Sequence, residues 1–319
     1  MKTRIISIVI LLFSMGATAQ ELNLPIQNQY VAESDFILAA AFAGIGDCWQ
    51  LRINGVSYWT GIKDAPNTQS LSVNGKIADR SGVGLTLFND QNGYTSQKGA
   101  IVSYAHHLTL NEDSKHYLSF GLSYRFTQFG IDVSEFDDGN GNNDLALWAN
   151  NFSLANSNFD VSVLYRLKDF FFSANLLNMV PKNIEKFDIR EPENLGNLYF
   201  YTGYTFKPKG SDFEIEPSVF YQRFLNDGRA TTDLNLKVRK IRNRDDYYWA
   251  GVNMRFTNEQ QFKPMFIAPM LGLKLNKFYA GYSYQININE FSQYGSGSHM
   301  LTLGYDFLCW ESACGCMQN

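Results

Sequence analysis

Four histidines are the most versatile side chains in the chain for acid–base or metal chemistry, and none of them stands in a catalytic pattern. His106 and His107 are adjacent in a segment of alternating polarity, and neighbouring strand residues point to opposite faces, so they cannot ligate one metal together. His116 and His299 fall at the expected starts of strands, where a solvated surface position is the simpler interpretation. The sequence has no Gly-x-Ser-x-Gly motif and no carboxylate pair at a spacing that demands acid–base work. It therefore predicts a protein that is not an enzyme and carries no cofactor.

One loop has the oxygen-rich spacing of a calcium site. Within residues 132–157 the stretch "DDGNGNND" places side-chain oxygens at alternate positions, on Asp138, Asn140, Asn142 and Asp144. In calcium loops the sixth position is a Gly that makes a tight turn and the twelfth is a Glu, but here the sixth is Asn143 and no Glu stands at the twelfth. The match is incomplete, so the default interpretation is an acidic surface loop without a metal.

Four cysteines could form disulfides in an exported chain. Cys48 lies at the start of the first expected strand and Cys309 just beyond the last, so a bridge between them would span the seam where those two strands meet. Cys314 and Cys316 are too few to hold a structural zinc ion by themselves. Free thiols in the tail and a bridge from the tail to Cys48 remain alternatives.

The N-terminus predicts export. The stretch "MKTRIISIVILLFSMGATAQ" has basic residues, then an apolar run, then small residues, which is the order of a secretory signal peptide. We expect cleavage after Ala19, leaving Gln20 as the first mature residue, with residues 1–19 removed. The apolar run is shorter than the roughly 20 residues of a membrane anchor. The net charge of −4, without clusters of basic residues, argues against a nucleic-acid partner.

The positions of these residues depend on long segments of alternating polarity. In "HYLSFGLSYRFTQ", residues 116–128, Leu and aromatic side chains share one parity and Ser, Gly, Arg and Thr the other, which indicates a strand with one apolar and one polar face. The same pattern recurs and predicts about fourteen strands, near 48–59, 67–78, 82–89, 98–110, 116–130, 158–168, 169–177, 197–207, 212–225, 230–241, 246–257, 263–274, 277–287 and 298–308.

The connections favour a transmembrane barrel over a soluble β-sandwich. Turns after even-numbered strands are short, such as "NEDS" and "KPKG", whereas most turns after odd-numbered strands are longer, such as "NDQNGYTSQ" and "VPKNIEKFDIREPENLG". Outer-membrane barrels have short periplasmic turns and long external loops, which places both termini in the periplasm. We predict an all-β outer-membrane barrel of about 14 antiparallel strands over residues 47–308, preceded by an N-terminal arm or plug at 20–46 and followed by a periplasmic tail at 309–319.

Several stretches together resemble the PorP/SprF family of outer-membrane proteins, which is associated with the type IX secretion system of Bacteroidetes. They include "AAAFAGIGDCWQLRINGVSYWTGIKDAPNTQSLSVNG", "LSFGLSYRF", "YYWAGVNMRF" and "FYAGYSYQININEFSQYGSGSHMLTLGYDF". The residues that fit the family pattern are Gly44, Trp59, Pro66, Thr68, Gly281 to Tyr284 and Gly297 to His299. Two positions depart from it: Ala39 and Ala40 replace an Asn-Pro pair, and Gln285 stands where an acidic residue is common.

The resemblance implies a binding role rather than catalysis. Members of this family are partners of the secretion machinery, and one branch helps to export or anchor large surface adhesins, including those used in gliding, through the cargo's C-terminal domain. The expected partners are such cargo, machinery subunits and outer-membrane lipid. A hypothesis of a different class is a passive channel or transporter for small solutes, with the arm at 20–46 as its plug.

Overall fold

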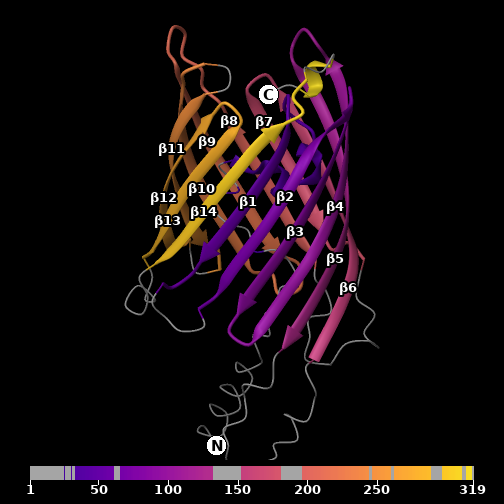
Figure 1. The fold of residues 1–319 in the computed structure, drawn as a ribbon, viewed down its shortest axis with the longest axis vertical. Helices are drawn as coiled ribbons and strands as arrows, with labels where there is room; N and C mark the ends of the chain where they lie inside the picture. Colours follow the sequence, from indigo (N-terminus) through magenta and orange to yellow (C-terminus); the bar gives the residue numbers. More distant parts are fainter. Residues whose placement is uncertain are drawn as a thin grey trace, which may run out of the picture.

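Alternating polarity folds this chain into a closed antiparallel β-barrel (Figure 1). The structure, a computed structural model, describes residues 25, 30, 33–60, 65–131, 152–180, 196–243, 246–259, 262–288, 297–310 and 314–317. Within them it has fourteen strands: β1 (Trp49–Ser57), β2 (Asn67–Ala78), β3 (Ser81–Asn92), β4 (Thr95–Asn111), β5 (His116–Ile131), β6 (Phe152–Leu167), β7 (Phe170–Leu177), β8 (Asn197–Tyr204), β9 (Phe213–Phe224), β10 (Ala230–Ile241), β11 (Tyr247–Thr257), β12 (Lys263–Leu275), β13 (Phe278–Asn287) and β14 (Ser298–Phe307).

Each strand pairs with its neighbours in sequence, and β1 pairs with β14 to close the barrel. At this seam the two strands run antiparallel over the whole of β1, from Trp49 opposite Phe307 to Ser57 opposite His299. Closure leaves no strand edge to face lipid, where an unpaired backbone group has no water to hydrogen-bond. The predicted fold class and the number of strands are confirmed.

The outer and inner faces of the barrel wall differ in polarity, because successive side chains of a strand point to opposite faces. On β5, Leu122 is 50% exposed on the outer surface, whereas the next residue, Ser123, is 4% exposed and faces the lumen. The outer surface carries aliphatic and aromatic side chains on every side of the barrel, which suits contact with lipid. In the described residues no helix is long and apolar enough to cross a membrane.

The two ends of the barrel differ in their connections. Short turns follow the even-numbered strands at one end, where the C-terminal tail also lies, and we call this the short-turn end (Figure 1). The opposite, long-loop end carries the connections at 132–151 and 178–196. One expectation is wrong here: "NDQNGYTSQ" is not a long loop, because β3 and β4 pair as far as Asn92 opposite Thr95 and leave only Gly93 and Tyr94 as the turn. The positive φ of Gly93 fits such a tight hairpin turn.

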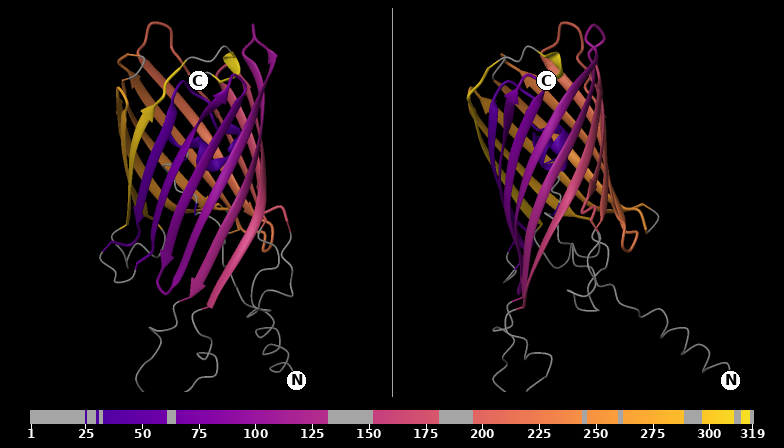
Figure 2. Two further views of the ribbon diagram at one scale, coloured as in Figure 1. Left: turned by 45° about the vertical axis from the view of Figure 1, so that its right-hand side comes forward. Right: turned by 90° about the vertical axis from the view of Figure 1, so that its right-hand side faces the viewer.

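Among the described residues, the short helical segments α3 (Asp35–Leu38) and η1 (Ala40–Phe42) lie inside the barrel. The helix α3 and the 3-10 helix η1 belong to the segment before β1, and Figure 2 shows this segment within the lumen. A second 3-10 helix, η6 (Gly315–Met317), belongs to the C-terminal tail and lies at the short-turn end. We call residues 30 and 33–46 the arm and residues 314–317 the tail. The lumen is therefore occupied by the chain's own ends.

Candidate functional site

Much of the inner wall of the barrel is polar and charged, although an apolar cluster that includes Tyr199, Tyr201 and Phe220 also faces the lumen. Beside the seam, Asp306 on β14 accepts a hydrogen bond from Arg52 on β1 at 2.7 Å and lies 2.6 Å from the ammonium of Lys274 on β12. On another part of the wall the guanidinium of Arg125 lies 2.8 Å from Asp160. These carboxylates are almost fully buried. Buried charges of this kind persist only where a partner compensates the loss of water.

The arm runs along the lumen from its long-loop half to its short-turn end. The Tyr30 hydroxyl is 3.0 Å from the hydroxyl of Ser70, the fourth residue of β2 counted from the long-loop end. At the other extreme, the Gly46 amide donates to the carbonyl of Met317 in the tail at 2.8 Å. Arm and tail therefore meet at the short-turn mouth, and the arm passes through the barrel between these two points.

Polar side chains of the wall satisfy the irregular backbone of the arm. The Ala41 amide donates to the Ser162 hydroxyl at 2.9 Å, and the Asn175 side chain donates to the Leu38 carbonyl at 2.6 Å. Backbone groups buried away from water need such partners, because an unpaired one costs about as much as a lost hydrogen bond. The wall thus holds the arm backbone through specific hydrogen bonds.

His107 connects the wall to the arm through both ring nitrogens. Its Nε2 is 3.0 Å from the carbonyl oxygen of Ala43, and its Nδ1 is 2.7 Å from the Ser119 hydroxyl. A carbonyl oxygen can only accept a hydrogen bond, so Nε2 carries the hydrogen and donates the bond. Nδ1 of the neutral ring then accepts a hydrogen bond from the Ser119 hydroxyl. The imidazole is completely buried. This histidine therefore positions the arm.

Glu33 makes a charged contact between the arm and the wall. Its carboxylate lies 3.8 Å from the ammonium of Lys237 and 3.5 Å from the guanidinium of Arg239, both on β10, and accepts from the Tyr247 hydroxyl at 3.1 Å. Lys237 also pairs with Glu216 on β9 at 3.1 Å. The two cations of β10 are thus shared between the wall and the arm, and Glu33 supplies part of their compensation.

Inward-facing glycines make room for the arm. A Cβ on Gly82 would lie 2.1 Å from the carbonyl oxygen of Ala43, and one on Gly121 would lie 2.3 Å from the amide nitrogen of Ala41. Real side chains do not approach a backbone so closely, so only glycine fits at these two places. Glycine inside a strand often marks such a close approach by another backbone.

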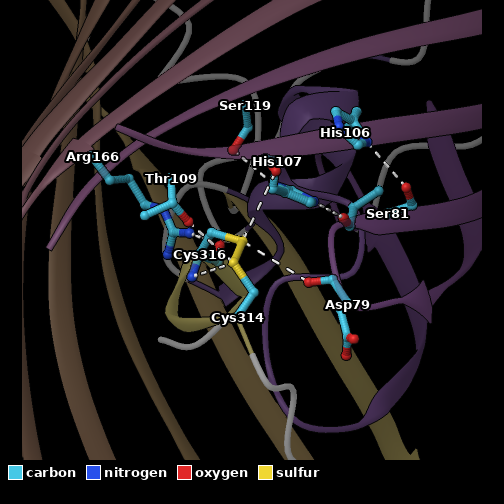
Figure 3. Close-up of a disulfide and its surroundings, with 10 residues drawn as sticks. Asp79, Ser81, His106, His107, Thr109, Ser119, Arg166, Cys314 and Cys316 are labelled. Carbon is cyan, nitrogen blue, oxygen red and sulfur yellow. Dashed lines mark hydrogen bonds between the residues drawn. A yellow bond between two sulfur atoms is a disulfide. The ribbon is translucent and has the colours of Figure 1, made fainter. Parts of the chain in front are cut away.

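The tail packs against the inner wall at the short-turn end, and Figure 3 shows its disulfide beside Thr109 and Arg166. Cys314 and Cys316 form a disulfide, the Cys314 sulfur lies 3.2 Å from the Thr109 hydroxyl, and the Arg166 guanidinium donates to the carbonyl of Cys316. Cys316 and Met317 are completely buried. The tail is therefore packed into the wall.

A second disulfide joins Cys48, before β1, to Cys309, after β14. Next to it the Trp310 amide donates to the carbonyl of Asp47 at 2.8 Å. Both contacts join the start of β1 to the end of β14. The seam is therefore closed by a covalent bond as well as by backbone hydrogen bonds.

The other residues singled out in the sequence do not assemble into a reactive site. His106 points outward, away from His107, and contacts the Ser81 hydroxyl at 3.2 Å. Asp138, Asn140, Asn142 and Asp144 lie outside the described residues, as do Ala19 and Gln20. In the part of the chain that the structure describes, no group of three or more His, Cys, Asp or Glu side chains could hold a metal ion.

Sequence reasoning missed the residues that hold the arm. Glu33 and Arg239 are more than 200 positions apart, and no local pattern links them. One signal was available: Gly82 and Gly121 occupy lumen-facing positions of strands, where a polar side chain is the rule for a water-filled barrel.

The chain is similar to several solved structures of outer-membrane proteins at very low sequence identity. The outer membrane protein Omp33 of Acinetobacter baumannii is 8% identical, with a TM-score of 0.44, covering 82% of this chain and 100% of its own. The TodX monoaromatic hydrocarbon channel, as a deletion mutant, is 9% identical with a TM-score of 0.49, covering 89% and 95%. The CymD monoaromatic hydrocarbon channel is 10% identical with a TM-score of 0.48, covering 88% and 93%. No protein with a curated description matches the sequence.

A family model provides the more specific comparison. The model of the type IX secretion system membrane protein PorP/SprF matches residues 19–305, which includes the arm and all of the barrel except the last two residues of β14. The match extends over most of the chain and agrees with the residues on which the resemblance was based. This protein, an outer-membrane β-barrel with its own arm inside the lumen, belongs to the PorP/SprF family of type IX secretion membrane proteins.

Proposed function

We propose that this barrel binds and anchors a large surface adhesin of the gliding type, or assists its export, by holding the cargo's C-terminal domain. Membership of a type IX secretion family supports the secretion role. The barrel is a binding partner of the secretion machinery and of cargo, and it performs no chemistry of its own.

The observation that favours binding over solute passage is the arm inside the lumen. Glu33 engages two cations and a tyrosine of the wall, His107 fixes the Ala43 carbonyl, and the tail packs into the wall at the short-turn end. A passive channel would need a continuous polar path, whereas here Ser162, Asn175 and His107 of the wall hydrogen-bond the arm. Under this proposal the cargo domain contacts the long-loop end, while the short turns and the tail meet periplasmic subunits.

The test is gentle detergent extraction of the affinity-tagged protein followed by mass spectrometry of what copurifies. Recovery of a secreted protein through its C-terminal domain, together with machinery subunits, supports the proposal. Recovery of the barrel alone, combined with steady conductance in planar bilayers, would contradict the binding role and favour a passive channel for small solutes.

We also propose that the C-terminal tail lies in the periplasm with the short turns. The same location was predicted for the N-terminus, which lies outside the described residues, whereas Tyr30 lies in the long-loop half of the lumen. Labelling of an Asn23→Cys variant with a membrane-impermeant maleimide tests on which side of the membrane the N-terminus lies. Reaction in intact cells places the N-terminus outside, whereas reaction only after permeabilisation places it in the periplasm.

A further inference from the structure

The strand β6 has an unpaired edge at the long-loop end of the barrel. On one side β6 pairs with β5 along its whole length, as far as Ile131 opposite Phe152. On its other side it pairs with β7 only over Val161 to Leu167. Figure 2 shows β5 and β6 projecting at the long-loop end. Among the described residues, the first part of β6, residues 152–157, therefore has a neighbouring strand on one side only.

The backbone groups of alternate β6 residues point to this open side. The Phe159 carbonyl accepts a hydrogen bond from the Met179 amide at 2.9 Å, on the side of β7. In an antiparallel ladder the N–H and C=O groups of every second residue point the same way. The N–H and C=O groups of Ser153, Ala155 and Ser157 therefore point to the open side, and within the described part of the chain no backbone group pairs with them there.

The chain after β7 begins to extend the pairing but cannot continue it. The Val180 amide donates to the side-chain oxygen of Asn158 at 2.8 Å, and the Val180 carbonyl accepts from the Asn158 side-chain nitrogen at 2.9 Å. The next residue in the sequence is Pro181, which a longer ladder would place opposite Ser157. Proline has no N–H to donate. The chain's own next residue therefore cannot complete the ladder at Ser157.

This edge lies beyond the apolar outer surface and has none of the usual protection of a strand edge. Toward the long-loop end the outward residues of β6 change from Val163 and Phe159 to Ser157 and Ala155. Exposed edges are usually blocked by charged residues or by proline, and "FSLANS", residues 152–157, contains neither. The edge therefore faces water and is open to an extended segment of another chain.

A buried amide beside the edge also lacks a partner. Asn156 faces the lumen and is 8% exposed, and its side-chain nitrogen has no hydrogen-bond partner among the described residues. The same holds for the hydroxyl of Thr127, which lies directly opposite Asn156 on β5. A strand added on the open side would face Asn156 in a non-hydrogen-bonded pair, where side chains lie closest. A Ser, Thr or Asn oxygen on that strand would satisfy the Asn156 amide.

We propose that residues 153–157 of β6 bind an extended segment of the cargo's C-terminal domain by strand addition, an inference that rests on the proposed function. The segment exchanges main-chain hydrogen bonds with Ser153, Ala155 and Ser157, and a polar side chain opposite Asn156 adds specificity. The edge lies at the long-loop end, where the proposed function places the cargo. Two copies of the barrel in one membrane share an orientation, so their β6 edges cannot pair antiparallel. The cargo is therefore the occupant.

The test uses the full-length purified barrel and, as the probe, the purified C-terminal domain of the secreted protein recovered in the extraction experiment. Ala155→Pro removes an N–H from the open edge and leaves the hydrogen bonds to β5, a position where a strand tolerates proline. It is expected to weaken binding about tenfold, the effect of losing about one main-chain hydrogen bond. Ala155→Val keeps the N–H, and this matched control is expected to bind as the wild type does. Heat-modifiable migration in gels confirms that each variant is folded.

Hydrogen exchange of the wild-type barrel is the second measurement. The Ala155 and Ser157 amides should exchange fast in the barrel alone and slowly with the domain bound. The Asn156 amide, which faces β5, is the internal control and should be protected in both states.

Four outcomes would overturn the inference. Equal binding by Ala155→Pro and wild type, without protection of these amides, would overturn the edge as the site and leave the proposed function standing. No binding of the domain to the wild type would overturn both. Protection of the Ala155 and Ser157 amides in the barrel alone would overturn the cargo as occupant, and equal losses in Ala155→Pro and Ala155→Val would overturn main-chain pairing.

Discussion

The carboxylate of Glu33 lies 3.5 Å from the guanidinium of Arg239, so a residue of the N-terminal arm compensates a charge on the inner wall of β10. Both side chains are largely buried, and Tyr247 donates a hydrogen bond to the same carboxylate. The arm therefore completes the electrostatics of the wall as well as filling its space. Displacing the arm would leave the cations of β10 with less compensation.

Neutralising Glu33 is expected to loosen the arm. Removing one partner of a buried ion pair costs about 3–5 kcal/mol when the remaining charge is uncompensated. Here Glu216 still pairs with Lys237 and Glu214 still pairs with Arg239, so we expect a cost below this range for Glu33→Gln. In planar bilayers the wild type should be silent and Glu33→Gln should show openings. Asp113→Asn, in the exposed turn after β4, is the control and should stay silent. Silence of Glu33→Gln with the arm still docked would show that this ion pair does not hold the arm.

Gly121→Val is expected to displace the arm by a steric route. The new Cβ would lie 2.3 Å from the Ala41 nitrogen, and overpacking of this kind costs about 1–3 kcal/mol. Limited proteolysis of the folded barrel should then cut within the arm. Gly55→Val places the same side chain on the outer surface, where nothing lies within 4 Å, and should leave the arm resistant. Equal resistance of both variants would contradict the seating of the arm against β5.

The outer face of β5 should tolerate charge only near its end. Leu122→Arg puts a cation into the apolar surface and should cost about 2–4 kcal/mol if the residue lies near the bilayer midplane. Gln128→Arg, at the same outward parity but closer to the long-loop end, should cost about 0–1 kcal/mol. Urea unfolding in lipid vesicles measures both. Equal losses would mean that the membrane boundary is not where the apolar surface ends.

A short turn should respond to acid through Asp246, which precedes β11. The Asn276 amide donates to the Asp246 carboxylate at 2.6 Å and the Asn243 side chain donates at 2.7 Å, and these bonds lower the pKa of Asp246 below its ordinary value. A lowered pKa means that the folded state binds the proton less readily than the unfolded state. The contact therefore stabilises the turn at neutral pH and is lost as pH falls through the folded pKa. The NMR shift of the Asn276 amide should titrate below about pH 4, the ordinary range of Asp. Asp246→Asn should abolish that titration, and a titration that persists in the variant would assign it to another group.

Much of the barrel could be predicted from residues 116–128 and the segments like them. A strand in lipid must alternate because its two faces meet different surroundings, so each strand carries the evidence for its own existence in its local sequence. The ends of the strands were less certain: β6 begins at Phe152, six residues before the expected start, and "NDQNGYTSQ" pairs almost to its tip. A loop that continues a hairpin beyond the membrane no longer has to alternate in hydrophobicity.

The contents of the lumen were decided only by the tertiary structure. Polar inward residues such as Ser162 or Asn175 have the same pattern whether they face water or hydrogen-bond an arm, so strand periodicity cannot distinguish an open barrel from an occupied one. The arm itself is irregular, and its contacts join residues such as Glu33 and Arg239 that only barrel closure brings together. The sequence by itself therefore determined the barrel and its lipid-facing surface, because these follow from local alternation, whereas the occupied lumen follows from long-range packing that no local pattern encodes.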